Sequence, residues 1–246
     1  ALQYSIETQA KASAEQKRLD GQAVARDKGT FGGVDLRYVE TLRHGWSLAA
    51  RFTMDFGRAD YRGGDGSRLE DVGQAIGRLD LIAAKDFELA GGATISPFIG
   101  LGSRVLIDRS GGRITDAGDY GYDREIQYNY VPIGLGVSLP VDGRGRLTID
   151  GQYNWLVGGD VETHLSDVDP SLPDFRLGLR RGHGVEARAR FAVPAGRHEI
   201  SFGPFVRHWS IARSKVRTFS DADGGVQFFE PRNRTWETGF AVAFGF

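Results

Sequence analysis

The chain has 246 residues, 35 of them glycine, no cysteine, and a formal net charge of −1. The missing thiols exclude disulfides and thiolate metal sites, and the balanced charge gives no overall attraction to nucleic acid. No apolar run approaches the roughly 20 residues that a membrane-spanning helix needs. Segments in which apolar and polar residues alternate recur from end to end, and this period of two predicts β-strands.

The first half of the chain predicts five strands, at residues 2–12, 33–39, 46–57, 77–83 and 95–108. Polar stretches without periodicity, at 13–29 and 58–73, predict long loops. Short glycine-containing stretches, near 42–45 and 90–92, predict tight turns. Because Ala1 leads directly into the first alternating segment, we expect the numbering to begin at the mature chain.

The second half predicts five more strands, at residues 128–137, 147–157, 185–193, 200–209 and 235–246. Long polar loops are expected at 109–125, 158–182 and 213–234, and tight turns at 140–145 and 194–197. Tight turns therefore alternate with long loops along the whole chain. We expect one domain, residues 1–246, with short turns on one side and five long loops on the other.

This pattern predicts an all-β fold, a transmembrane antiparallel up-and-down β-barrel of about 10 strands, with 8 or 12 as alternatives. The bulky apolar face of each strand would meet lipid, at residues that include Trp46, Leu79, Ile99, Leu135, Trp155 and Phe240. A soluble β-sandwich is the competing fold. It is disfavoured because arginines and acids occupy the opposite face of most strands.

The last strand carries Trp236, Phe240, Phe244 and Phe246 on one face and ends on that final aromatic residue. With the preceding run Phe229-Glu-Pro-Arg-Asn-Arg-Thr-Trp-Glu-Thr-Gly, it resembles the closing hairpin of small, porin-like outer-membrane β-barrel proteins of Gram-negative bacteria. The resemblance implies the cell outer membrane, N- and C-termini in the periplasm, and contact with lipopolysaccharide. It also implies that the barrel-assembly machinery reads Phe240, Phe244 and Phe246. It identifies a class and not an activity.

Charged residues on the inward face predict a network inside the barrel, because charges in a narrow lumen are costly unless they are paired. The expected members are Glu7, Arg37, Arg51, Asp55, Arg78, Asp80, Arg104, Asp150, Glu186, Arg188, Arg190, Arg207 and Glu237. Folding each hairpin about the middle of its loop predicts the pairs Glu7–Arg37, Asp55–Arg78, Arg51–Asp80, Asp150–Arg190 and Arg207–Glu237. It also sets Phe205 against Gly239 and Tyr130 against Gly102, large against small. The interior is then either a structural plug or a narrow small-solute channel whose arginines select anions.

Basic residues where the predicted loops meet strands suggest a second feature, a belt that contacts lipid A phosphates. Guanidinium groups bind phosphate in a bidentate manner, which suits this role. The expected members are Arg58, Arg62, Arg109, Arg113, Arg124, Arg213, Lys215 and Arg217. The partner of the external loops is unknown, and loop-mediated ligand binding is an alternative function.

Enzymatic alternatives rest on few residues. His208-Trp209-Ser210 resembles the His-x-Ser element of outer-membrane lipid A deacylases, but Ile211 stands where the family has asparagine and Glu237 faces inward. An omptin-like protease needs acids and an Asp-His couple from opposite walls, whereas the candidates all lie in or beside one loop: Asp160, His164, Asp167, Asp169 and His183. The acids Asp116, Asp119, Asp123 and Glu125 have no defined calcium-binding spacing. An autotransporter translocator would usually carry a helix through its pore. We expect no cofactor and no metal.

Overall fold

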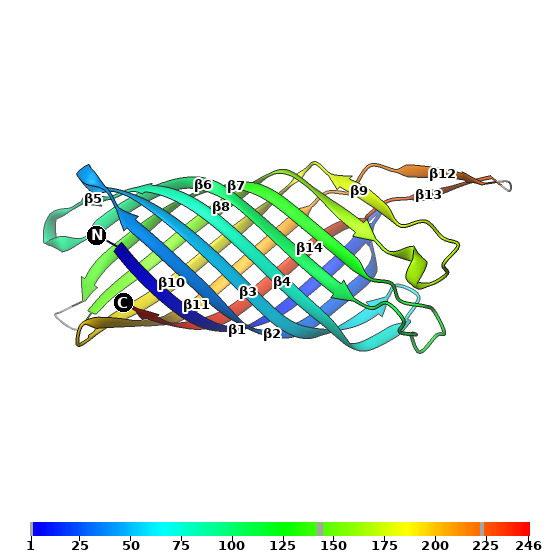
Figure 1. The fold of residues 1–246 in the computed structure, drawn as a ribbon, viewed down its shortest axis with the longest axis horizontal. Helices are drawn as coiled ribbons and strands as arrows, with labels where there is room; N and C mark the ends of the chain where they lie inside the picture. Colours follow the sequence, from blue (N-terminus) through cyan, green and yellow to red (C-terminus); the bar gives the residue numbers. More distant parts are fainter. Residues whose placement is uncertain (1, 142–144, 222–223) are drawn as a thin grey trace.

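A computed structural model describes residues 2–141, 145–221 and 224–246. Ten long strands form a closed antiparallel barrel, in which each strand pairs with its neighbours in sequence and the last pairs with the first (Figure 1). The strands are β1 (Leu2–Leu19), β2 (Gln22–Thr41), β3 (Trp46–Gly63), β4 (Arg68–Lys85), β6 (Thr94–Arg109), β7 (Arg124–Val141), β8 (Gly145–Thr163), β10 (Gly182–Ala195), β11 (His198–Ile211) and β14 (Arg232–Gly245). The predicted fold class is confirmed.

The remaining elements lie at the two ends of the barrel. Both termini and the short strand β5 (Phe87–Glu88) lie at one end, here called the turn end (Figure 1). At the other end, the loop end, β9 (Phe175–Leu179) pairs with the last residues of β8. There β12 (Arg217–Asp221) and β13 (Gly224–Phe228) also form a projecting hairpin. Three short 3-10 turns complete the chain: η1 (Arg43–Gly45), η2 (Ala90–Gly92) and η3 (Leu165–Asp167). Among the described residues, no helix has the length and apolar character to cross a membrane.

The outer face carries the apolar side of every long strand. The residues expected to meet lipid all face outward and are between 45% and 61% exposed: Trp46, Leu79, Ile99, Leu135, Trp155 and Phe240. On β3 this face is apolar from Trp46 to Phe56 and then changes to Arg58 and Asp60. The ring of outward-facing apolar side chains is here called the apolar belt. About 9–11 residues of a tilted strand cross a bilayer, so the loop-end part of the barrel extends beyond this belt.

Two predicted loops are wrong, because the strands are longer than their apolar faces. Residues 13–29 are mostly strand, and β1 turns into β2 at Asp20–Gly21, where φ is positive at both residues. Residues 58–73 likewise belong mostly to β3 and β4. Beyond the apolar belt both faces of a strand can be polar, so alternation stops although backbone pairing continues. The loop end therefore has three long connections and two tight turns, not five long loops.

Candidate functional site: the lumen and its two mouths

The middle of the lumen is filled by buried ion pairs. One centre is Glu237 on β14, which is 1% exposed. Its carboxylate lies 3.1 Å from Lys11 Nζ, 2.9 Å from Arg104 Nη2 and 3.3 Å from Arg207 Nη1. Lys11 and Arg207 come from the neighbouring strands β1 and β11, whereas Arg104 comes from β6, which is not a neighbour of β14. Side chains therefore meet across the barrel as well as between adjacent strands.

A second centre is Glu186 on β10. It lies 2.5 Å from Arg78 Nη1 and 3.1 Å from Arg207 Nε, and Arg51 and Arg188 each approach it to 3.7 Å. Because Arg207 binds both centres, the two clusters form one network.

The whole network, here called the charge plug, is electrically balanced. It joins six carboxylates, Glu7, Asp35, Asp55, Asp80, Glu186 and Glu237, to six cations, Lys11, Arg51, Arg78, Arg104, Arg188 and Arg207. Buried charges are tolerated when they are paired, and each of these twelve residues forms at least one ion pair within the network. A neutral plug also leaves little net field to attract ions of either sign into the lumen.

Aromatic residues fill the lumen on the loop side of the charge plug. Trp209 contacts Tyr128 and Tyr130, with ring centroids 5.3 and 5.2 Å apart, and all three are almost completely buried. The Tyr130 hydroxyl donates to Asp80 at 2.7 Å and accepts from Arg78 Nε at 2.9 Å. The aromatic layer is thus hydrogen-bonded directly to the charge plug.

Glycines on adjacent strands make room for the rings of Tyr130 and Phe205. A Cβ on Gly102 would lie 2.2 Å from the Tyr130 ring, and one on Gly239 would lie 2.5 Å from Phe205. Both glycines lie directly opposite those aromatic residues, in the predicted register. The lumen is therefore packed by large side chains against small ones.

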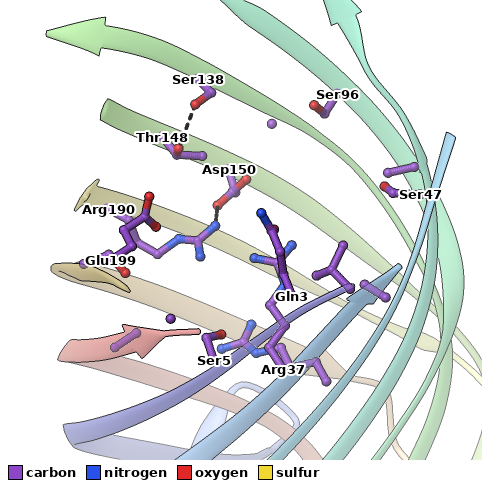
Figure 2. Close-up of a pocket in the computed structure, with 18 of the residues that line it drawn as sticks. Gln3, Ser5, Arg37, Ser47, Ser96, Ser138, Thr148, Asp150, Arg190 and Glu199 are labelled. Atoms are coloured by element: carbon purple, nitrogen blue, oxygen red, sulfur yellow. Dashed lines mark hydrogen bonds and ion pairs between the residues drawn. The ribbon is translucent and has the colours of Figure 1, made fainter. Parts of the chain in front are cut away.

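The turn end holds a polar cavity of about 640 Å³ (Figure 2). Figure 2 shows Ser138 hydrogen-bonded to Thr148, and Arg190 paired with Asp150 at 3.0 Å. The Arg190 and Asp150 side chains are 21% and 28% exposed, so this pair is much wetter than the charge plug. Arg37 also lines the cavity, and Arg51, Glu186 and Arg188 of the charge plug form its inner limit. A solute entering from this end would meet the plug.

The loop end of the lumen holds an excess of acids. Lys17 Nζ pairs with Glu230 at 2.7 Å, and Arg124 Nη2 pairs with Asp108 at 3.0 Å. Asp27, only 8% exposed, makes no hydrogen bond or ion pair with any residue that the structure describes. The described residues contain no group of three or more acids and histidines arranged to hold a metal ion.

Two of the predicted hairpin registers are wrong by two residues. Glu7 lies opposite Asp35, not Arg37, because the first hairpin turns at Asp20–Gly21 and contains a bulge between Lys17 and Arg18. Asp150 lies opposite Arg188, not Arg190, although the Asp150 and Arg190 side chains still reach each other diagonally. A two-residue slip keeps every side chain on its predicted face while changing its partner.

Other expected partners are replaced by residues from the same strand or from a strand one or two places away. Arg51 and Asp80 are in register, yet Arg51 binds Asp35 and Asp80 binds Arg78. Asp55 does not pair with Arg78; its carboxylate forms an ion pair with Lys11 Nζ at 2.7 Å. Arg207 and Glu237 are both in register and paired.

Sequence reasoning missed two members of the charge plug, Lys11 and Asp35. Both lie on the inward face of their strands and are 4% and 2% exposed. In the sequence, both residues alternate with outward-facing residues, and this pattern could have identified them as facing the lumen. Conversely, Arg37, Asp150 and Arg190 line the turn-end cavity outside the charge plug.

Most residues of the predicted phosphate belt are exposed near the loop end. Arg58 lies 3.8 Å from Asp71, and Arg113 donates to the backbone oxygens of Glu70 and Asp71. Arg62, Arg109, Arg213, Lys215 and Arg217 are exposed. The prediction that Arg124 belongs to this belt is wrong. On β7 its side chain points into the lumen toward Asp108 and Glu230, away from any lipid.

The residues of the expected assembly signal lie on the outer face of β14 and just beyond it. Phe240 and Phe244 face outward, and Phe246 follows the end of the strand. Phe244 and Phe246 form an aromatic group with His198, with centroid distances of 5.0 to 5.6 Å. These side chains are accessible on the turn-end part of the barrel surface.

The weak catalytic candidates His208 and Ser210 face outward on β11. The His208 ring packs on Trp236, with centroids 4.3 Å apart. No acid among the described residues forms an ion pair or hydrogen bond with His208. The geometry gives the His-x-Ser element no orienting carboxylate.

The loop acids considered for a protease site are dispersed. His164 lies 3.4 Å from Asp174, and the backbone amide of Ser166 donates to Asp174 and lowers the pKa of that carboxyl. His183 is on the outer wall, stacked on Tyr153. Asp116 accepts a hydrogen bond from the backbone amide of Arg68 on β4, and Asp123 accepts one from Gly111 in its own loop, so both carboxylates order the loop end.

Comparison with known proteins agrees with this geometry. No protein-family model matches the chain. The pertactin autotransporter of Bordetella parapertussis is 32% identical over 135 residues, which are 52% of this chain and 14% of that protein. The crystal structure of outer membrane protease OmpT from Escherichia coli matches with a TM-score of 0.64 and 12% identity, covering 100% of this chain and 96% of that one. At this identity the likeness establishes the fold alone. The chain has the fold of an outer-membrane β-barrel of Gram-negative bacteria.

Proposed function

We propose that the protein is a structural outer-membrane barrel whose lumen is closed at rest. The observation that carries this proposal is the charge plug, in which six acids and six bases are paired at the level of the apolar belt. The aromatic layer of Tyr128, Tyr130 and Trp209 adds a second seal. Because the side chains of both layers are buried, we expect no steady conductance.

Single-channel recording in planar bilayers tests the closed state. The refolded wild-type barrel should be silent, and the double variant Arg207→Ala with Glu237→Ala should show openings because it removes the residue that joins the two centres. The double variant Asp150→Ala with Arg190→Ala is the matched control and should stay silent, because it widens only the turn-end cavity. Steady wild-type openings would instead support the narrow small-solute channel.

The proposed orientation places the turn end, with both termini, in the periplasm and the loop end outside the cell. Support comes from the short turns at one end and long connections at the other, the arrangement of bacterial outer-membrane barrels. In this orientation Phe240, Phe244 and Phe246 are presented to the barrel-assembly machinery. The exposed belt residues would then face lipopolysaccharide. Protease access to the loop-end hairpin on intact cells would test the orientation.

Loop-mediated binding is the second candidate. It is favoured by the β12–β13 hairpin, which projects from the barrel and is anchored where Phe228 contacts the Phe175 ring at 4.7 Å (Figure 1). Replacing residues 217–228 by a glycine-serine linker should leave the barrel folded and closed. If the hairpin binds a surface partner, photo-cross-linking from Thr218 on intact cells should give a product that is missing when the cross-linker is placed at Glu125, which is exposed at the loop end outside the hairpin.

Three further activities can be tested with the same preparations, two of them suggested by the likenesses to an autotransporter and to a protease. A translocator domain would need a lumen wide enough for a passenger segment, so a wild-type conductance much larger than that of a narrow small-solute channel would favour it. Release of acyl chains from lipopolysaccharide would favour a deacylase, and peptide cleavage an omptin-like protease. The charge plug and the dispersed histidines make the closed structural barrel the better-supported function.

A further inference from the structure

Four arginines line an open cavity of about 470 Å³ at the loop end of β1 and β14. Arg18 belongs to β1, Arg232 and Arg234 belong to β14, and Arg213 lies in the connection that follows β11. All four side chains are exposed, whereas their neighbours Lys17 and Asn233 point into the lumen. The cavity is therefore on the outer wall of the barrel and is separate from the lumen.

Strand register forces these positive charges together. Arg18 lies directly opposite Arg232, and Arg234 follows two residues later on the same face of β14. Like charges directly opposite one another destabilise a sheet. An arrangement of this kind is favourable when an anion lies between the charges.

The chain itself does not neutralise this group. Arg18 donates to the backbone oxygen of Gly21 at 2.6 Å, and Arg213 stacks over Phe229 at 5.2 Å. Within the described part of the chain, none of the four arginines forms an ion pair. Asp20, in the turn, also lines the cavity and leaves an excess of three positive charges. The arginines of the charge plug, by contrast, are each paired with a carboxylate.

The height of the cavity indicates what could supply the anion. Trp236 faces outward on β14, is 54% exposed, and packs on His208, as an aromatic residue at a membrane interface does. At about 3.3 Å per residue, Arg234 and Arg232 lie roughly 7 and 13 Å further along the strand. That distance carries them from the edge of the apolar belt into the head-group layer.

We propose that Arg18, Arg213, Arg232 and Arg234 form a binding site for a phosphate monoester on a lipid head group. Guanidinium groups bind phosphate through two parallel N–H···O bonds, and several of them can surround one doubly charged group. Three of these residues lie outside the predicted phosphate belt. The belt is a diffuse ring of basic residues, whereas this proposal places one defined site at the barrel seam, where the first strand β1 pairs with the last strand β14.

Thermal unfolding of the full refolded chain in nanodiscs tests the site. Phosphorylated lipid A should raise the Tm of the wild type above its value in dephosphorylated lipid A. The double variant Arg18→Gln with Arg232→Gln should lose most of that rise and bind phosphorylated lipid A about tenfold more weakly. In dephosphorylated lipid A it should be at least as stable as the wild type, since it removes a like-charge pair.

The matched control is Arg26→Gln with Lys28→Gln, because these two exposed cations lie on the outer face of β2 at the loop end and belong neither to the cavity nor to the predicted phosphate belt. It should keep the wild-type response. Equal losses in both double variants would replace the seam site by a diffuse basic belt and overturn the proposal. An equal Tm rise with inorganic phosphate alone would overturn the lipid as the source. If the glutamine variant does not fold, Arg18→Lys with Arg232→Lys provides the comparison, and undiminished lipid A binding by it would contradict bidentate recognition.

Discussion

Arg207 and Glu237 lie directly opposite each other on β11 and β14, and Arg207 Nη1 is 3.3 Å from the Glu237 carboxylate. The same guanidinium reaches Glu186 through Nε at 3.1 Å. One arginine therefore connects both centres of the charge plug. Its position joins the two centres into one unit, which the proposed closed state requires.

Glu237→Gln should destabilise the barrel strongly. The substitution leaves Lys11, Arg104 and Arg207 with one neutral amide in place of a carboxylate that is 1% exposed. Breaking a buried ion pair costs about 3–5 kcal/mol, so a loss in this range is expected from urea unfolding in lipid vesicles. Glu199→Gln, at the exposed rim of the turn-end cavity, should cost much less. A loss for Glu237→Gln no larger than for this control would mean that water screens the charge plug.

Gly102→Leu should be poorly tolerated, because even a Cβ at this position would lie 2.2 Å from the Tyr130 ring. Overpacking of this kind typically costs about 1–3 kcal/mol. Gly77→Leu is the matched control: Gly77 lies on the outer face of the neighbouring strand β4, and a Cβ added there would meet no atom within 4 Å. Urea unfolding should separate the two variants, and equal stability would show that Tyr130 can move aside.

The faces of the strands could be predicted from the sequence, whereas most partners could not. Leu79 and Phe240 face outward and Glu7 and Glu237 inward, because a period of two assigns a face from composition alone. Pairing needs the register, and a slip of two residues changes partners without changing faces. Hairpin arithmetic therefore matches Glu7 with Arg37, which is on the correct face but two residues from the true register.

Contacts across the barrel could not be predicted by folding each hairpin about its loop, because they join strands that belong to different hairpins. Arg78 binds Glu186 from 108 residues away, and Arg104 binds Glu237 from 133 residues away. Such partners are set by barrel closure and by the reach of an arginine side chain. The loop-end parts of β1 and β2 could not be predicted as strands from the sequence. Glu15 and Asp27 face a polar interior there while their neighbours face water, so apolar and polar residues do not alternate.

Leu79→Arg should cost about 2–4 kcal/mol if this position lies near the middle of the bilayer. Leu79 faces outward on β4 and is 45% exposed, within the apolar belt. Glu125→Arg serves as the control, since Glu125 is exposed at the loop end and lies opposite Glu162. Folding titrations in lipid vesicles should show the loss for Leu79 alone; a Leu79→Arg variant as stable as the wild type would place the membrane elsewhere on the barrel.

Arg190→Ala should have only a small effect on stability, although Arg190 Nη2 lies 3.0 Å from Asp150. Both side chains are partly exposed in the turn-end cavity, and ion pairs that water reaches contribute about 0–1 kcal/mol. A double-mutant cycle with Asp150→Ala, measured by urea unfolding, should therefore give a coupling free energy below about 1 kcal/mol. A coupling of several kcal/mol would show that this pair belongs energetically to the charge plug, and that the seal extends to the turn end of the barrel.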